Sequence, residues 1–387
     1  MFKYFSKFFY EKTETKKLAN SKDVNFSSAF SNKKFISNDN LFIENPCVRR
    51  SVNLIASSVA SLKFKLCFKG DSVFSGAVFD LFNNPNYRET WSSFVESVIT
   101  NWIIYGNSYL MFSKVNGSFQ INSLKPDRVS VIPGEFGIPK GFEYSVDNKT
   151  LTFDNDGQLP YIGHFKNFNP KDDWYGLSLL DSVQASASLH QAITTHNYSL
   201  VQNGGRPSGV AVLKNRSAPL SKMDKEKLMD AFSKDYQGPN NAGKVIFMEN
   251  HDFDWKCLGS SPSDMDFVSA KNLAAREISE ALGVPAMLIG GVGVNGEASK
   301  ANFKEVINRF NEATIIPLAE RFFAFINSWL LDKIFPGYKL TLDLESFLPL
   351  YDKRISLWEK VDKASFLSQE EKREILGFPA KQESVNE

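Results

Sequence analysis

Apolar residues recur at helical spacing from Ser178 to Asn203, near the middle of the chain. About 26 residues at roughly 1.5 Å each predict a helix about 39 Å long. Asp181, three residues after the first serine, is typical of a helix start, and a Gly-Gly pair shortly before Pro207 favours a stop. The apolar stripe is thin, and residues 185–188 are all Ala or Ser. Small side chains suit close approach to other helices or a wet surface; an ordinary core helix of an α/β protein is the alternative.

A second long helical pattern begins at Ser261-Pro262-Ser263-Asp264 and ends at Gly283. A capping serine, a proline at the first helical position and an acid in the first turn are all typical of a helix start. Shorter patterns between the two helices predict a strand at Gly209 to Leu213, a charged helix at Ser221 to Tyr236, and strands at Lys244 to Met248 and Phe253 to Leu258. The two helices should therefore form a hairpin that carries a small domain at its tip.

Helices and short strands are predicted on both sides of this hairpin. Asn45-Pro46 favours a helix start, and the alternation from Leu62 to Lys69 predicts a strand with one buried face. Short alternating runs from Tyr109 to Phe165, around the turn pair Asn116-Gly117, predict a small β-rich unit, a sandwich or a barrel. Other expected elements are a helix after Thr90 ending at Gly106, a helix from about Ala298 to Ile334 broken at Pro317, a strand at Tyr338 to Leu344, and two short helices after Leu350 with a capping box at Ser368 and Glu371.

Charge and cysteine content narrow the function classes. The chain has 45 Lys and Arg against 44 Asp and Glu, a net charge of +1, so any contact with DNA or an anionic membrane must be local. Three scattered cysteines argue against a disulfide framework and a zinc module, and they favour a reducing compartment. No apolar run approaches the roughly 18 residues that predict a membrane span.

The N-terminal residues MFKYFSKFFYEK are basic and aromatic, and residues 10–40 are rich in Lys, Ser and Asn without periodicity. This composition predicts an extended or disordered arm. We expect the arm to dock on a neighbouring subunit or to stay mobile, and a membrane-surface helix is the alternative.

Few groupings in the sequence suggest chemistry. The motif Gly291-x-Gly293-x-x-Gly296 matches the dinucleotide-binding fingerprint by letter, but the strand and helix context of that fingerprint is missing. His190 and His196 lie about 600° apart around a helix, so they do not share a face, and solvent or interface positions are expected. Carboxylates beside turns and helix starts, such as Asp172 and Asp266, are explained by capping. We therefore predict no enzyme, no cofactor and no metal site.

Five segments carry a family resemblance. They are NPCVRRSVNLIASSVASLKFKL (Asn45 to Leu66), LFNNPN with IIYGNSYLMF (Leu81 to Phe112), GLSLLDSVQASASLHQAITTHNYSLVQNGGRPSGV (Gly176 to Val210), AAREISEALGVPAMLIG (Ala274 to Gly290) and the terminal LSQEEKREILGFP. In this order the chain resembles the portal proteins of tailed double-stranded DNA phages, of the Hong Kong 97-like type, including those of prophages and gene transfer agents.

The resemblance implies an α+β portal fold. Its parts would be an N-terminal arm (1–40), a β-rich and helical wing (41–172), stem helix 1 (173–205), a small α/β clip (206–259), stem helix 2 (260–285), a glycine-rich tunnel loop (286–300), the long helix and strand of the wing (301–345) and a short helical crown (346–387). The basic, aromatic start has no counterpart among the family's motifs, so the resemblance gives it no role.

The function implied by the resemblance is that of a head-tail connector. The subunit would form a homo-oligomeric ring of twelve copies in the virion, at the capsid vertex. Double-stranded DNA would be packaged and ejected through this ring without sequence specificity. The ring would bind the terminase large subunit, a head-tail adaptor, and the major capsid and scaffolding proteins. The subunit would be made in the cytoplasm of a bacterial host, without integral membrane association.

The resemblance also assigns site residues. The DNA-facing tunnel loop would comprise Gly290, Gly291, Val292, Gly293, Val294, Asn295, Gly296 and Lys300. Stem contacts between subunits would comprise Val183, Ala187, His190, Thr194, Asn197, Val201, Asp266, Ser269 and Leu273. Clip contacts with terminase or adaptor would comprise Arg216, Lys222, Lys225, Lys227 and Lys234. Stem helix 1 should then be more exposed in a single chain than in the ring.

Two alternatives from other classes stay open on the sequence. One is a nucleotide-binding enzyme that uses the loop from Gly291 to Gly296. The other is a peripheral membrane or scaffold protein that uses the basic, aromatic N-terminus.

Overall fold

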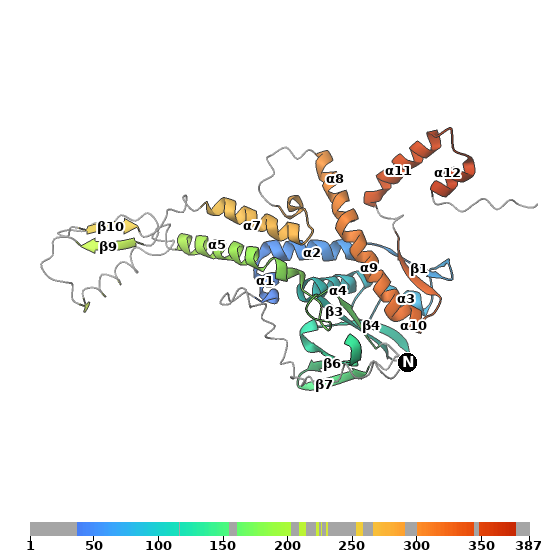
Figure 1. Cartoon of the computed structure of the whole chain (residues 1–387), viewed down its shortest axis with the longest axis horizontal. Coiled ribbons are helices and arrows are strands. Elements are labelled where there is room, and N and C mark those ends of the chain that lie inside the picture. Colours follow the sequence, from blue (N-terminus) through green and yellow to red (C-terminus); the bar gives the residue numbers. More distant parts are fainter. Residues whose placement is uncertain are drawn as a thin grey trace, which may run out of the picture. The chain divides into compact units, whose positions relative to one another are not determined.

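The computed structural model describes residues 37–115, 117–154, 161–202, 209–213, 253–257, 266–290, 300–343 and 348–376, and also positions 222, 223, 226 and 230 (Figure 1). Helices and small antiparallel sheets make up these residues, in the mixed architecture that the sequence predicts. Among the helices of these ranges, none combines the length and the hydropathy needed to cross a membrane.

Early in the chain come helices α1 (Asn38–Glu44), α2 (Pro46–Ala60), α3 (Ala77–Asn83) and α4 (Trp91–Tyr105). The Asn45 side chain accepts hydrogen bonds from two amides in the first turn of α2, as an N-cap does. Thr90 caps α4, and Gly106 ends α4 in the left-handed conformation, with a φ of 71°. The predicted starts and the predicted stop are therefore confirmed.

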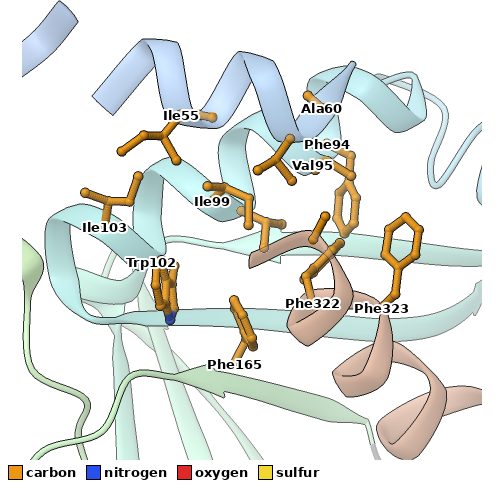
Figure 2. Close-up of a cluster of buried hydrophobic side chains, with 14 of the residues drawn as sticks. Ile55, Ala60, Phe94, Val95, Ile99, Trp102, Ile103, Phe165, Phe322 and Phe323 are labelled. Atoms are coloured by element: carbon orange, nitrogen blue, oxygen red, sulfur yellow. The ribbon is translucent and has the colours of Figure 1, made fainter. Parts of the chain in front are cut away.

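The main core lies where α2 and α4 pack together and where α9 (Ile316–Ile326) joins them. Figure 2 shows Ile55 of α2, Ile99 of α4 and Phe322 of α9 within one buried cluster. Because each helix buries apolar residues at helical spacing, the removal of this surface from water is the main force that holds the three helices together.

All pairings in the described sheets are antiparallel. The first sheet has the strand order β11 (Tyr338–Leu342), β1 (Phe64–Phe68) and β2 (Asp71–Val73). The second sheet has the order β4 (Ser118–Leu124), β3 (Asn107–Val115) and β8 (Ile162–Lys166). The third sheet has the order β5 (Val129–Ile132), β6 (Gly141–Val146) and β7 (Lys149–Asp154). Leu66 lies opposite Leu340, and both are buried, so the first sheet extends the main core. This pairing joins an early segment of the chain to a late one.

The predicted β-rich unit consists of the second and third sheets. Side chains from both sheets meet in a second core, which contains Tyr109, Leu124, Val129, Val131, Phe142 and Ile162. The two sheets thus pack on each other as in a sandwich.

The predicted long C-terminal helix is interrupted twice. Helix α8 (Lys300–Phe310) passes through the π-helical turn η6 (Asn311–Ile315) into α9, and α9 passes through a second π-helical turn, η7 (Asn327–Leu331), into α10 (Asp332–Ile334). Pro317 has no amide hydrogen, so the first interruption falls where the sequence predicts a break. The second interruption has no proline and was not predicted.

Two helices follow the first sheet: α11 (Leu348–Lys363) and α12 (Gln369–Ile375). The Ser368 amide donates to the Glu371 carboxylate over 2.8 Å, and the Glu371 amide donates to the Ser368 hydroxyl over 3.2 Å. This reciprocal pair is the predicted capping box, and it holds the pKa of the Glu371 carboxyl below its ordinary value.

Candidate functional site

Helices α5 (Gln184–Gln202) and α7 (Phe267–Ala281) contact each other along the molecule, and strands β9 (Gly209–Leu213) and β10 (Phe253–Cys257) fall between them in the sequence (Figure 1). Both strands are predicted from the sequence, and the structure adds that they pair with each other. The structure therefore brings together the two long helices that the sequence singles out, and we take this pair as the candidate site.

Both helices are shorter than predicted. Leu179–Ser182 form a 3-10 turn, η3, which Ser178 caps, and α5 starts only at Gln184. Helix α7 starts at Phe267 and not near Pro262, because Asp266 has a left-handed φ of 42° and its carboxylate accepts a hydrogen bond from the Ser269 amide. Asp266 is therefore the N-cap of α7: its own backbone is not helical, and the helix begins at the next residue.

Residues 176–178 lead into η3 and α5, and we call them the root of α5. Two glycines, Gly106 and Gly176, allow this root to lie directly against the end of α4 and the start of β3. A Cβ on Gly106 would lie 2.4 Å from the carbonyl carbon of Leu177, and a Cβ on Gly176 would lie 2.1 Å from the carbonyl oxygen of Gly106. These distances are far shorter than any carbon contact, so both positions require glycine. Just after them, the Ser178 hydroxyl donates to the Ile104 carbonyl at the end of α4 over 2.6 Å.

Asn107 ties the same root to the second sheet. Its side-chain oxygen accepts from the Gly176 amide over 2.7 Å, and its side-chain nitrogen donates to the Gly176 carbonyl over 3.1 Å. The same oxygen lies 2.9 Å from Nε2 of His164, so this nitrogen carries the proton. Burial, and secondarily the charge of Lys166, lower the pKa of His164 to about 3, which keeps the ring neutral.

Between α5 and α7 the contact surface is small and close. Ala187 and Ile193 of α5, and Ala274 and Ile278 of α7, are buried. The Ser186 hydroxyl donates to the Glu277 carboxylate over 2.6 Å. The Ala and Ser residues in the middle of α5 therefore allow the close approach of helices that their size predicts.

His190 is buried, with only 3% of its surface exposed, so the expected solvent or interface position is wrong for the single chain. Its Nε2 lies 3.6 Å from the Cys47 sulfur on α2. Burial is the main cause that lowers the pKa of His190 and raises the pKa of Cys47, which favours the uncharged form of each. The sequence pattern could not show this, because the contact joins residues far apart in the chain.

The predicted stem contacts fall into three groups by exposure. Val183, Ala187 and His190 are buried inside the chain; Thr194 and Asn197 are half-buried; Val201, Asp266, Ser269 and Leu273 are exposed. Of these, only the exposed group presents a full side chain to other molecules.

Further apolar side chains on these helices are exposed, although the sequence analysis did not select them: Leu189, Tyr198 and Val268. With Val201 (66% exposed) and Leu273 (59% exposed) they make five large apolar side chains that the single chain leaves uncovered. Leu273 lies off the stripe of α7 that the chain's own core buries, which is a signal in the sequence. Val201 lies only about 20° around α5 from the buried His190, so its exposure comes from its place at the far end of the helix and not from the pattern.

Little of the predicted tunnel loop lies within the described residues. Gly290 is left-handed, with a φ of 79°, and ends the 3-10 turn η5 (Ala286–Ile289); Lys300 begins α8. The remaining predicted loop residues, Gly291, Val292, Gly293, Val294, Asn295 and Gly296, lie outside the described residues.

Most of the predicted clip contacts also lie outside the residues that the structure describes. Lys222 occupies an exposed helical position, whereas Arg216, Lys225, Lys227 and Lys234 are not described. The predicted strand from Lys244 to Met248 lies outside the described residues as well.

Known proteins are similar to this chain in sequence and in fold. The family profile described as phage portal protein matches residues 46–377. A chain of the neck of an empty GTA particle, computed with C6 symmetry, is 34% identical with a TM-score of 0.68, over 89% of this chain and 93% of that chain. A chain of the neck of a native GTA particle, computed with C12 symmetry, is 35% identical with a TM-score of 0.65, over 88% and 91%.

A more distant structure shares the fold. It is that of an HK97 family phage portal protein from Corynebacterium diphtheriae, which is 15% identical, with a TM-score of 0.54, over 80% of this chain and 96% of that chain.

Proposed function

The chain belongs to the phage portal protein family, and we propose that it is the subunit of a portal ring at the vertex of a phage-like capsid. The relatives in GTA necks were computed with C6 and C12 symmetry. A homo-oligomeric ring within the virion agrees with both symmetries, and twelve subunits is the number we propose.

The observation that carries the proposal is the exposed apolar surface of α5 and α7. Val268 and Leu273 lie about 140° apart around α7, and Leu189 and Tyr198 lie about 180° apart around α5, at 100° per residue. A closed ring joins two different surfaces of each subunit. Apolar side chains on opposite flanks of one helix pair are what such a head-to-tail contact requires.

We assign the parts of the chain to a portal as follows. Residues 41–172 and 301–345 form the wing, α5 and α7 the stem, residues 206–259 the clip, residues 286–300 the tunnel loop, and residues 346–387 the crown. The pairing of β1 with β11 supports a wing made from an early and a late part of the chain, because it joins Phe64–Phe68 to Tyr338–Leu342.

The channel would let DNA slide. Each added phosphate contact strengthens salt-dependent binding, so a chain with a net charge of +1 suits passage better than a strongly basic chain. The loop from Gly290 to Lys300 would face the DNA without reading its bases, since glycine-rich backbone carries no side chains for base contacts.

The subunit would have no catalytic role, and the ATP hydrolysis that drives packaging would belong to the terminase. Terminase and the head-tail adaptor would bind in turn at the clip, where Lys222 is an exposed candidate contact. The capsid and scaffolding proteins would contact the outer parts of the ring. No described feature favours the nucleotide-binding or the membrane alternative.

Native mass spectrometry and end-on electron microscopy of the purified protein test the proposal. We expect a ring with a central pore and a mass of twelve subunits. A protein that stays monomeric at every concentration, or a particle without a pore, would contradict the proposal. Shortening the loop from Gly290 to Asn295 should leave the ring intact and impair DNA packaging.

A further inference from the structure

An exposed loop between β5 and β6 holds a large apolar side chain in solvent. Phe136 is 95% exposed, and Ile138 beside it is also exposed. Phe136 has a left-handed φ of 55°, which a bulky residue rarely adopts. An exposed aromatic side chain on a strained backbone does not stabilise the single chain; it can stabilise the protein only by contact with another molecule.

The glycines around Phe136 fix the shape of the loop. A Cβ on Gly134 would lie 2.3 Å from the Ile138 carbonyl oxygen, and a Cβ on Gly137 would lie 3.8 Å from the Asp173 Cβ. One side of the loop therefore faces Asp173, in the segment that leads to α5, and Phe136 remains exposed. We call Glu135, Phe136 and Ile138 the wing knob.

A groove of about 480 Å³ opens beside β1 and β2, at the start of α4. Its wall is aromatic: the rings of Phe64 and Trp91 lie 5.4 Å apart, and those of Phe64 and Phe79 lie 6.4 Å apart. Phe74 lines the groove and is exposed, and Lys63 lines it at another exposed position.

The knob and the groove complement each other. An aromatic side chain with a neighbouring isoleucine matches an aromatic wall. Of the charged residues that line the groove, Lys65 and Asp343 form an ion pair at 3.1 Å, and the carboxylate of Glu135 matches the exposed ammonium of Lys63. Within one chain they belong to different packing units, because the groove is part of the main core and the knob extends from the sheet of the second core. Among the described surfaces of this chain the knob is the one that matches the groove, so a second copy of the chain would supply it.

We infer that the wing knob of one subunit inserts into the groove of its neighbour in the ring. The inference rests on the proposed portal ring, and it names a second contact, away from α5 and α7. Because knob and groove are different surfaces, each subunit offers the knob to one neighbour and the groove to the other, which is the head-to-tail arrangement that closes a ring.

Charge exchange tests the contact. We expect Glu135→Lys and Lys63→Glu each to raise the concentration for half-maximal ring assembly about tenfold. The double variant, Glu135→Lys with Lys63→Glu, should restore most of the loss, whereas Lys149→Glu, on the exposed β7, should change little. Circular-dichroism melting checks that each single chain folds. Single variants that assemble like the parent, or a double variant no better than the singles, would overturn the inference.

Cross-linking provides an independent measurement. An equal mixture of Phe136→Cys chains and Phe74→Cys chains, assembled and then oxidised, should give covalent dimers that neither chain gives alone. Rings that form without these dimers would refute the knob-and-groove contact and leave the portal function standing. Failure of the unmodified protein to form any ring would instead refute the proposed function.

Discussion

Gly106 and Gly176 meet back to back at the root of α5, and neither position has room for a side chain. The sequence indicates a helix stop at Gly106, and the structure adds a second reason for the glycine, the close approach of Leu177. The second reason involves residues about 70 positions apart, so no local pattern could reveal it. The same holds for the burial of His190 against Cys47.

The glycine contact predicts a difference between two substitutions. Gly106→Ala should lower the free energy of unfolding by about 3 kcal/mol, because the new methyl group would overlap the backbone before α5. Gly117→Ala is the matched control: Gly117 also has a positive φ, 85°, but nothing lies within 4 Å of its added Cβ. Its cost should be about 1 kcal/mol, from φ alone. Urea unfolding would compare them, and equal losses would contradict the close contact.

His164 predicts how stability depends on pH. Its pKa is about 3 in the fold against an ordinary 6.5, so only the unfolded chain takes up a proton as the pH falls from about 6.5 to 3. Stability due to His164 is therefore complete above pH 6.5 and is lost below it, by about 2 kcal/mol at pH 5. His164→Gln keeps a donor for Asn107 and removes this titration. Urea unfolding at pH 7 and pH 5 should show a smaller drop for the variant; an equal drop would contradict the prediction.

At the scale of elements, helix ends were predictable and helix interruptions were not. Caps such as Asn45 and the Ser368–Glu371 box depend on residues close in sequence, so they can be read directly. The second π-helical turn begins at Asn327, whose side chain accepts from the Leu340 amide over 2.8 Å and donates to the Leu340 carbonyl over 2.9 Å. That pairing with β11 is a tertiary contact, which helical periodicity does not show.

Asn327 should therefore hold β11 against the long helix. Asn327→Ala leaves the Leu340 amide and carbonyl without their partner and should cost about 2 kcal/mol of unfolding free energy. Asn327→Asp should cost more, because a carboxylate oxygen would replace the donor that faces the Leu340 carbonyl. Ser328→Ala, at the exposed neighbouring position, is the control and should change stability by less than about 0.5 kcal/mol. Equal stability of all three variants would contradict this account.

At the scale of the whole molecule, five large apolar side chains on α5 and α7 are exposed in the single chain, and a ring contact would cover them. The thin stripe of α5 predicts an exposed helix, and the far end of α5 is exposed at Tyr198 and Val201, whereas its first half is buried against α2 and α7. The family resemblance supplied the ring, which patterning within one chain cannot, because a ring depends on surfaces of two copies.

A charge on this surface should stop assembly and leave the subunit folded. We expect Leu273→Asp to shift the protein from rings to monomers in native mass spectrometry, because the ring contact would bury an unpaired carboxylate. The melting temperature of the monomer should stay unchanged, since Leu273 is exposed in the single chain. Leu151→Asp, at an exposed apolar position on β7, should still form rings. Normal rings from Leu273→Asp would exclude this surface from the contact.

The joint at the root of α5 also has a mechanical consequence. At this joint the backbone of Gly106 lies directly against the backbone of Gly176 and Leu177, and the Asn107 side chain is held to the Gly176 backbone by two hydrogen bonds. Such an attachment resembles a beam with a clamped end: a load on the outer end of α5 is carried into the sheet as a bending moment instead of being relieved by rotation at the joint. Twisting of the ring would then strain the wings before it tilts the helices.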